Sequence, residues 1–512
     1  MDDGLHHECG LVAVYDLAGE RPGSPSVVRS AVGMLLDVQN RGQLAAGISG
    51  YRPGRSEPIR TYKAPGTVRE AFSLARPGEF DRIADDVDGV AVIGHTRYAT
   101  SGHDDDIRYA QPFERRHGRL WKWFSLAFNG NLANYVDLRG RLLEKSGYHF
   151  SLDSDTEVLM HYLSNRLRGE QRPDLVSVMR NLSEEFDGAY NIAFLDAAGR
   201  MFVSRDPSGF HPLCYGVVDS VLAAANESVA LHNVGVHDVR HLEPGEMLVV
   251  EDGRYTVSRY APSEPSKCFF EWVYFAHAGS EIDDQSVYQA RLNLGQTMAD
   301  REWVAYSAAD TIVVPVPDTA KAAADAFAYA LGLPCLEGVL RNRYVGRTFI
   351  EPSSGRAHAA RSKYSVVPEV LKGKRVFLVE DSLVRSTTLR VLGRLLLEYG
   401  EAREVHVRIA SPPIVSPCFY GVNMSTRDEL FAPNFVDDGY EGEPPKEVLE
   451  AMAEDLGVDS LGYLPVADVG KAVGVEQQDL CLACVTGRYP TAAGESLVRI
   501  RCTDTEPHRG TT

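Results

Sequence analysis

The feature that most constrains the fold of this 512-residue chain is the stretch 376–390. Four apolar residues lead into Glu380 and Asp381, and a run rich in small hydroxyl side chains follows. Apolar residues then recur at helical spacing, at Leu389, Leu392 and Leu396. The pattern predicts a buried strand that ends in two carboxylates beside a helix N-terminus, where free backbone N–H groups favour a phosphate. By itself it is also compatible with an acidic strand-to-helix loop that binds nothing.

A second strand-to-loop pattern lies upstream, where the apolar run 311–316 leads into Pro317-Asp318-Thr319. An Ala-rich helix is expected at 320–331, a helix after the opening stretch up to residue 399, and a further strand at 404–410. This alternation predicts a parallel α/β sheet, whose ligands bind beyond the carboxyl ends of the strands. Thr319 is therefore expected at the same sheet edge as the two carboxylates.

The first half of the chain has a different pattern, of many short apolar runs with a few amphipathic segments. Strands are expected at 11–15, 90–94, 120–128, 192–195, 201–204 and 247–250, and helices at 27–37, 134–146, 157–168 and 175–186. Neighbouring strands joined by short turns predict antiparallel sheets with helices outside, which is an α+β layered domain. The polar, Pro-rich stretch 261–267 is the expected linker. We expect domains at 9–260 and 268–470, then a C-terminal segment at 471–512 with a disordered tail.

Composition narrows the classes of function. The net charge of −18 argues against a general nucleic-acid surface and against an anionic membrane surface. No apolar run approaches the roughly 18 residues of a membrane span, and the acidic, polar first residues do not resemble a targeting signal. We therefore expect a cytoplasmic protein with small-molecule partners.

Several residues of the first half could together bind an amino acid and attack its side-chain amide. Cys9 is a candidate nucleophile, and the Arg97 guanidinium could clamp a carboxylate. The Asn129-Gly130-Asn131 sequence is typical of a turn, and it offers an amide side chain and a backbone N–H as oxyanion donors. Asp155, at the start of a predicted helix, could hold an ammonium group. Each feature is weak alone; a buried thiol is usually only a small apolar group.

A basic segment in the second half contains Arg343, Arg347 and Lys363. A solvated loop is one interpretation. The other is a lid that closes over a phosphate-bearing substrate.

These motifs resemble a known family. Those of the first half look like the glutaminase half of class II glutamine amidotransferases: Cys9-Gly10, Asn40-Arg41-Gly42-Gln43, His95-Thr96-Arg97-Tyr98, Asn129-Gly130-Asn131 and Ser154-Asp155-Thr156-Glu157. Those of the second half resemble the phosphoribosyltransferase half of the amidophosphoribosyltransferase family: Pro315-Val316-Pro317-Asp318-Thr319, residues 342–349 and residues 380–388. The resemblance runs in order from about residue 9 to residue 490. It implies an N-terminal-nucleophile glutaminase domain with αββα layers, followed by an α/β type I phosphoribosyltransferase domain.

The resemblance implies a two-step reaction. Cys9 attacks the glutamine amide and releases ammonia, which displaces pyrophosphate from C1 of phosphoribosyl pyrophosphate and gives 5-phosphoribosylamine, the first committed step of purine synthesis. In this family the base is the α-amino group of the cysteine itself. Residues 1–8 would therefore be a propeptide that is removed before Cys9.

The resemblance also implies roles for individual residues. In the first half Arg97 would bind the glutamine carboxylate, Asp155 its α-amino group, and Asn129 and Gly130 the oxyanion. In the second half, Mg²⁺ and the ribose-pyrophosphate would lie at Thr319, Glu380 and Asp381. The 5-phosphate would lie in the loop of Ser382, Arg385, Ser386, Thr387 and Thr388. The lid would carry Arg343, Arg347 and Lys363 and exclude water.

Four of the eight cysteines resemble the ligands of the [4Fe–4S] form of the family: Cys268, Cys418, Cys481 and Cys484. Chemistry alone leaves zinc open, because the same four thiolates suit it. A cluster would be structural, since the reaction transfers no electron. The family further implies feedback inhibition by purine nucleotides and a homotetramer.

A few positions depart from the family pattern. Asn40 and Leu44 replace His and Glu near the glutaminase pocket, Glu380 replaces an Asp, and Ser386 replaces a Gly. If residue 386 needs a left-handed backbone, the serine costs about 1–2 kcal/mol. These departures leave two alternatives: a paralogue with the same chemistry in a secondary pathway, or a non-catalytic iron–sulfur or nucleotide-binding regulator.

Overall fold

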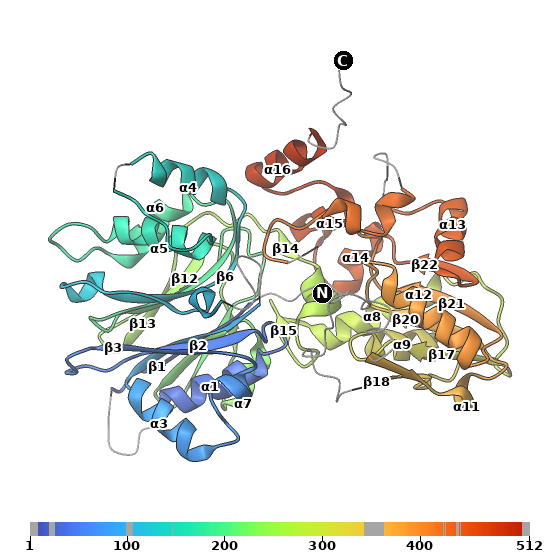
Figure 1. The fold of residues 1–512 in the computed structure, drawn as a ribbon, viewed down its shortest axis with the longest axis horizontal. Helices are drawn as coiled ribbons and strands as arrows, with labels where there is room; N and C mark the ends of the chain where they lie inside the picture. Colours follow the sequence, from blue (N-terminus) through green and yellow to red (C-terminus); the bar gives the residue numbers. More distant parts are fainter. Residues whose placement is uncertain are drawn as a thin grey trace.

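The computed structural model describes residues 9–19, 26–98, 106–145, 147–342, 363–422, 424, 426–436, 440 and 442–503, with backbone only at 500–503. The predicted propeptide, the lid residues Arg343 and Arg347, and the end of the tail lie outside the described residues. Figure 1 shows two lobes, one formed by the first half of the chain and one by the second half.

Two antiparallel sheets form the core of the first lobe. The larger sheet has the strand order β11-β9-β10-β1-β4-β2-β3. Its strands are β1 (Gly10–Asp16), β2 (Ala45–Tyr51), β3 (Ile59–Pro65), β4 (Ala91–Arg97), β9 (Cys214–Val218), β10 (Val221–Ala225) and β11 (Arg240–His241). The smaller sheet has the order β13-β12-β8-β7-β6-β5. Its strands are β5 (Phe113–Arg115), β6 (Phe124–Leu132), β7 (Gly188–Asp196), β8 (Met201–Ser204), β12 (Glu246–Glu251) and β13 (Arg254–Arg259).

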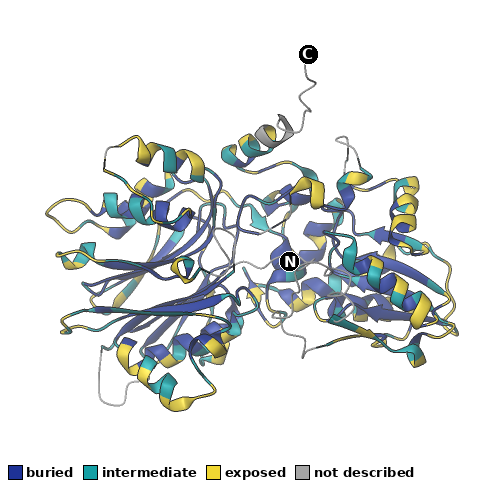
Figure 2. Ribbon diagram, viewed as in Figure 1, coloured by how far each residue is buried: buried dark blue, intermediate teal, exposed yellow. Residues whose placement is uncertain are grey.

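Alternation along the strands explains the layers. On β1, Leu11 and Ala13 pack into a core shared by both sheets, whereas Val12 and Val14 pack with the helix that contains Leu35. The helices beside the larger sheet are α1 (Val27–Asp37), α2 (Val68–Ala71), α3 (Pro77–Val87) and α7 (Ser228–Asn233). Those beside the smaller sheet are α4 (Tyr135–Leu143), α5 (Asp155–Arg166) and α6 (Leu175–Ser183). Figure 2 shows buried strands between helices with exposed outer faces, so the predicted αββα arrangement is confirmed.

The second lobe contains a parallel sheet with the order β17-β20-β21-β22. Its strands are β17 (Thr311–Pro315), β20 (Arg375–Glu380), β21 (Glu404–Ile409) and β22 (Ser460–Tyr463). On β20, Phe377 and Val379 face α8 (Val287–Asp300), α9 (Lys321–Leu331) and α14 (Val466–Val473), whereas Val376 and Leu378 face α12 (Thr387–Arg394) and α13 (Lys446–Leu456). The predicted α/β half is therefore confirmed.

Short elements complete the second lobe and join the two lobes. They are β14 (Lys267–Cys268), β15 (Glu281–Ile282), β16 (Gln285–Ser286), β18 (Val339–Arg341), β19 (Tyr364–Val366), α11 (Pro368–Leu371), β23 (Leu480–Cys481), α15 (Ala483–Thr486) and α16 (Ala492–Thr503). Strands β14 and β23 pair in parallel, which brings a segment from the start of the second half against one near its end. The boundaries predicted for the domains stay predictions.

Some local predictions are wrong, among them the helix expected at 175–186, which ends at Ser183. The strand expected at 120–128 begins only at Phe124, because Leu120–Lys122 forms a 3₁₀ turn in which Leu120 is exposed. The turn expected at Asn129-Gly130-Asn131 is part of β6, because pairing with β7 continues to Leu132 and Gly130 takes the positive φ inside the strand. The helix expected at 134–146 ends at Leu143.

Within the described part of the chain, none of the helices combines the length and the apolar character that crossing a bilayer would require.

The core between the two sheets makes a stability prediction. Leu195 on β7 is fully buried there, so Leu195→Ala should lower the free energy of unfolding by about 2–5 kcal/mol. Val257→Ala on β13 is the matched control, because Val257 is 37% exposed and should change stability by less than about 0.5 kcal/mol. Urea unfolding followed by tryptophan fluorescence measures both; equal effects would contradict the proposed layering.

Candidate active site

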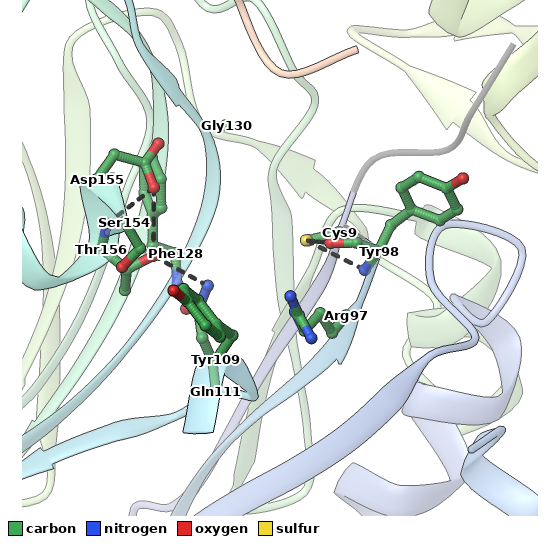
Figure 3. Close-up of a pocket in the computed structure, with 10 residues that line it drawn as sticks. All are labelled: Cys9, Arg97, Tyr98, Tyr109, Gln111, Phe128, Gly130, Ser154, Asp155 and Thr156. Carbon is green, nitrogen blue, oxygen red and sulfur yellow. Dashed lines mark hydrogen bonds between the residues drawn. The ribbon is translucent and has the colours of Figure 1, made fainter. Parts of the chain in front are cut away.

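A pocket in the first lobe gathers the residues expected to handle an amino acid (Figure 3). Its lining consists of Cys9, Arg97, Tyr98, Tyr109, Gln111, Phe128, Gly130, Ser154, Asp155 and Thr156. Figure 3 shows Cys9, Tyr98 and Arg97 on one side and Asp155 with its neighbours on the other. The pocket therefore offers a thiol, a cation and an anion around one space.

Cys9 lies directly before β1 at the wall of this pocket. Its Sγ is 3.5 Å from the Tyr98 amide N and 3.6 Å from the Tyr98 carbonyl O, so the backbone after β4 holds the thiol. The next residue must be glycine, since a Cβ at Gly10 would lie 2.5 Å from Thr96 Oγ1. Steric crowding by Thr96 thus explains why a glycine follows Cys9.

Arg97 and Asp155 provide opposite charges on the two sides. Arg97 ends β4, is almost fully buried, and stacks its guanidinium 5.4 Å from the Tyr109 ring centroid. Asp155 is the first residue of α5, whose N-cap is Ser154. Burial raises the pKa of Asp155 to about 6, and the Thr156 N–H, 2.8 Å from Oδ1, opposes the shift only partly. A buried carboxylate of this kind is ready for a substrate cation.

The end of β6 supplies the candidate oxyanion donors. Asn129 is buried, and its Nδ2 has no hydrogen-bond partner among the described residues. The strand before it is held by His95, whose Nε2 is 3.1 Å from the Phe128 carbonyl O, and by Gln111, whose Oε1 accepts the Phe128 N–H at 2.7 Å. Burial lowers the pKa of His95 to about 3, so the ring stays neutral and donates from Nε2.

Gln111 and Tyr109 are among the lining residues that sequence reasoning missed. Gln111 bridges β6 and α5, because its Nε2 also lies 3.3 Å from Thr156 Oγ1. Tyr109 belongs to a short 3₁₀ turn and covers the Arg97 guanidinium. Neither residue lies in a motif, and no sequence signal would have singled them out.

The second candidate site lies at the carboxyl end of the parallel sheet, where Thr319, Glu380 and Asp381 meet as expected. The Thr319 hydroxyl donates to Asp381 Oδ2, and the Ser382 hydroxyl donates to Oδ1 at 2.6 Å. Burial, together with repulsion from Asp381, raises the pKa of Glu380; burial likewise raises the pKa of Asp381. The Lys363 ammonium partly offsets the charge on Glu380. The two neighbouring carboxyl groups, Glu380 and Asp381, therefore need a shared proton, hydroxyl donors or a bound cation to offset their mutual repulsion.

The loop that follows opens onto a cavity of about 450 Å³. Of the five residues expected around a phosphate, three line it: Arg385, Ser386 and Thr387. Ser382 binds Asp381 instead, and Thr388 lies in the first turn of α12. Ser386 has a φ of −78°, so no left-handed backbone and no strain arise from its replacing a glycine.

Four cysteines meet in a third pocket near the junction of the lobes. Cys268, Cys418, Cys481 and Cys484 line it together with apolar side chains such as Phe270. Pairing of β14 with β23 sets Cys268 opposite Cys481. Burial raises the pKa of Cys481 to about 12, and burial with the neighbouring thiols raises that of Cys484. Uncompensated thiolates here would be costly, which suits a cationic metal centre.

The four thiols line one pocket. Among the described residues, no group of three or more His, Cys, Asp or Glu side chains is close enough to hold a single metal ion. A tetrahedral zinc ion needs four sulfurs about 2.3 Å from one centre. Four thiolates are soft donors that suit zinc and an iron–sulfur cluster alike, so the donor set fits either centre.

Asn40, expected near the glutaminase pocket, is not one of the residues that line it. Its Nδ2 donates to the Phe275 carbonyl O at 2.9 Å and lies 3.2 Å from Glu227 Oε1, at the junction between the lobes. Its replacement of the family's His therefore affects the junction.

Comparison with known protein families first identifies the class of the first lobe. A family model described as a glutamine amidotransferase domain matches residues 95–233. The matched part contains Arg97, Gly130 and Asp155 of the pocket, and also Asn129, which precedes Gly130 on β6.

Curated relatives extend the match over nearly the whole chain. Amidophosphoribosyltransferase of Archaeoglobus fulgidus is 38% identical over 490 residues, covering 94% of this chain and 98% of the relative. Those of Methanothermobacter thermautotrophicus and Bacillus subtilis are 35% and 36% identical, each covering 95% of both chains. The chain belongs to the amidophosphoribosyltransferase family.

Two solved structures agree with this assignment. One, described as the allosteric regulatory enzyme of purine biosynthesis, has a TM-score of 0.81 at 34% identity and covers 95% of this chain and 97% of its own. The other, glutamine phosphoribosylpyrophosphate amidotransferase from B. subtilis complexed with ADP and GMP, has a TM-score of 0.80 at 34% identity and covers 95% of this chain and 98% of its own.

The raised pKa of Asp155 predicts a pH dependence. Below about pH 6 the carboxyl of the free protein is protonated and cannot pair with an ammonium group. The kcat/KM for glutamine hydrolysis should therefore show an inflection near pH 6, in addition to the one expected from the α-amino base of Cys9, whose ordinary pKa is about 7.7–8.0. Glutamate release measured from pH 4.5 to 8 checks this.

Asp155→Asn is the control for that profile. It should lose the inflection near pH 6 and lower kcat/KM about 10- to 100-fold at pH 8, the usual value of a charge-assisted hydrogen bond. An inflection that persists unchanged in Asp155→Asn would assign it to another group.

Proposed function

We propose that this protein releases ammonia from glutamine in its first lobe and transfers it to phosphoribosyl pyrophosphate in its second, forming 5-phosphoribosylamine. The observation that carries this proposal is the pairing of two sites in one chain. One is a pocket with Cys9, Arg97 and Asp155, and the other is a buried carboxylate pair, Glu380 and Asp381, at a parallel-sheet edge. Family membership supports the same reaction.

In the first step, Arg97 binds the glutamine carboxylate and Asp155 its α-ammonium group. Cys9 Sγ attacks the side-chain amide carbon, and the developing oxyanion accepts hydrogen bonds from Asn129 Nδ2 and the Gly130 N–H. The C–N bond then breaks as the leaving NH₂ group takes the proton that the base removed from the thiol, so that it departs as ammonia. Water then hydrolyses the thioester to glutamate and regenerates the thiol. The base is the α-amino group of Cys9, exposed once residues 1–8 are removed.

In the second step, ammonia forms a bond to C1 of the ribose and pyrophosphate leaves. Glu380 and Asp381 accept hydrogen bonds from the ribose hydroxyls, and Thr319 orients Asp381. Arg385, Ser386 and Thr387 border the cavity that receives the 5-phosphate, with Ser382 and Thr388 beside it. Arg343, Arg347 and Lys363 would belong to the lid over the substrate.

Magnesium fits this site as a companion of the substrate. The described residues offer two carboxylates and a hydroxyl here and no complete metal cage. Mg²⁺ commonly keeps several waters and binds through one or two carboxylates plus substrate phosphates. When bound, it would neutralise the leaving pyrophosphate.

An iron–sulfur cluster is our proposal for the four-thiol pocket. Cys268, Cys418, Cys481 and Cys484 would hold it, and it would tie the C-terminal segment to the start of the second half. Inhibition by purine nucleotides, a homotetramer and a cytoplasmic location are further proposals. The B. subtilis structure with ADP and GMP supports the first of them.

Cys9→Ala should separate the two steps. Glutamine-driven pyrophosphate release should fall at least about 10³-fold, while ammonia-driven release stays within about twofold of wild type, because the second site is untouched. Intact mass should show residues 1–8 absent from wild type and retained in the variant if cleavage needs the thiol. Equal loss with both nitrogen donors would contradict the proposal, and no turnover with either donor in wild type would favour a non-catalytic regulator.

The cluster makes a separate prediction. Anaerobically purified protein should contain about four iron and four sulfide per chain. Cys481→Ser should lose most of both, whereas Cys335→Ser, outside the four-thiol pocket, should keep them. Zinc without sulfide in wild type would identify the other metal.

A further inference from the structure

A segment of the second lobe packs directly on Gly130, one of the two proposed oxyanion donors of the first lobe, and on its neighbour Asn131. The Asn131 Nδ2 donates to the Phe419 carbonyl O at 2.8 Å. A Cβ placed on Gly421 would lie 3.1 Å from His211 Nε2, 3.2 Å from Gly130 Cα and 3.3 Å from the Gly130 carbonyl carbon. The backbones of residues 130 and 421 therefore touch, with room for a hydrogen between them and little room for a methyl group.

Gly130 is also confined on its other side. A Cβ at Gly130 would lie 2.1 Å from the Ala189 carbonyl O, and the residue has a φ of +139°. β7 is central in its sheet, paired with both β6 and β8, and cannot move aside. Gly130 is thus held between a core strand and the segment 419–421.

The segment 419–421 is itself anchored. His211 Nε2 donates to the Tyr420 carbonyl O at 2.8 Å, and His211 Nδ1 lies 3.2 Å from Glu271 Oε1. The Tyr420 ring stacks on Phe210 with centroids 4.2 Å apart and planes 18° apart. His211, Glu271 and Tyr420 are all buried. A group added at residue 421 would therefore push on both His211 and Gly130, because its own segment is fixed.

We propose that Gly421, in the second lobe, is a positioning residue for the oxyanion site of the first. Its φ of +115° and its missing side chain let the 419–421 segment reach Gly130 and hold the peptide at the end of β6. The inference rests on the proposed function, because it assumes that Gly130 donates to the oxyanion. An oxyanion donor works only within a few tenths of an ångström of its ideal distance, so a displaced peptide lowers kcat and leaves glutamine binding by Arg97 and Asp155 intact.

Gly421→Ala tests the proposal. The kcat of glutamine hydrolysis should fall about 10- to 100-fold, because one donor is misplaced but not removed. The KM for glutamine should stay within about threefold, and ammonia-driven turnover should equal that of wild type. A general folding defect would lower both activities together.

Gly442→Ala is the matched control. Gly442 has a φ of +101°, and a Cβ there would lie 3.0 Å from Val466 Cβ, so the substitution is strained and crowded to a similar degree. It touches Val466 and not the glutaminase half, so its glutaminase kcat should remain at the wild-type value. A loss like that of Gly421→Ala would mean that strain in the second lobe is the cause.

The remaining outcomes separate this inference from the proposed function. Unchanged glutaminase kcat in Gly421→Ala, beside a Cys9→Ala variant that has lost glutamine use, overturns the positioning role alone. Full glutamine use in Cys9→Ala overturns the proposed function.

Should Gly421→Ala not fold, a second variant tests the same contact. Asn131→Ala removes only the hydrogen bond to Phe419, and it should lower the kcat of glutamine hydrolysis about 2- to 10-fold with KM unchanged. Wild-type kcat in that variant would then overturn the inference.

Discussion

The structure depends on one buried ion-pair network at the junction of the lobes. Arg41, on the first lobe, binds Glu227 at 2.8 Å and Glu271, at the start of the second half, at 2.7 Å, with all three side chains buried. Burial alone would raise the pKa of Glu271, but Arg41 and His211 outweigh it and hold the pKa below its usual range. Separating the lobes would take Glu271 away from Arg41, which keeps Glu227, and breaking a buried pair of this kind typically costs about 3–5 kcal/mol. The docked arrangement is therefore the one in which these charges are satisfied.

Docking has consequences for both chemistries. Glu271 contacts His211, and His211 donates a hydrogen bond to the Tyr420 carbonyl in the segment that packs on Gly130. The ion-pair network is therefore connected to the oxyanion site. The four-thiol pocket lies beside the same segment, since the Tyr420 N–H donates to Cys418 Sγ at 3.3 Å. The layers of each lobe provide rigid strands, and the reactive groups lie at strand ends next to this junction. The reactive groups are thus positioned mainly by well-packed backbone segments, and less by long, flexible side chains.

Much of each site could be predicted from sequence, and the rest could not for identifiable reasons. Asp155 follows an N-cap serine, and the carboxylate pair follows an apolar strand, so local patterns placed them. Gln111, His211 and Gly421 act through contacts with residues far away in the chain, and nothing near them marks those contacts. The Asn129-Gly130-Asn131 sequence suggested a turn because its local preference is strong. Pairing with β7 overrode that preference.

The sequence by itself determined the two fold classes, the order of the lobes and most of the groups that can do chemistry. Period-two and helical apolar patterns specify which face of each element is buried, and the residue types at strand ends specify the reactive groups. Only the tertiary structure decided how these groups are oriented, that Ser386 is unstrained, and that the second lobe reaches the strand of Asn129 and Gly130. The physical reason is that such contacts join residues hundreds of positions apart, and their geometry is set by the packing of whole layers.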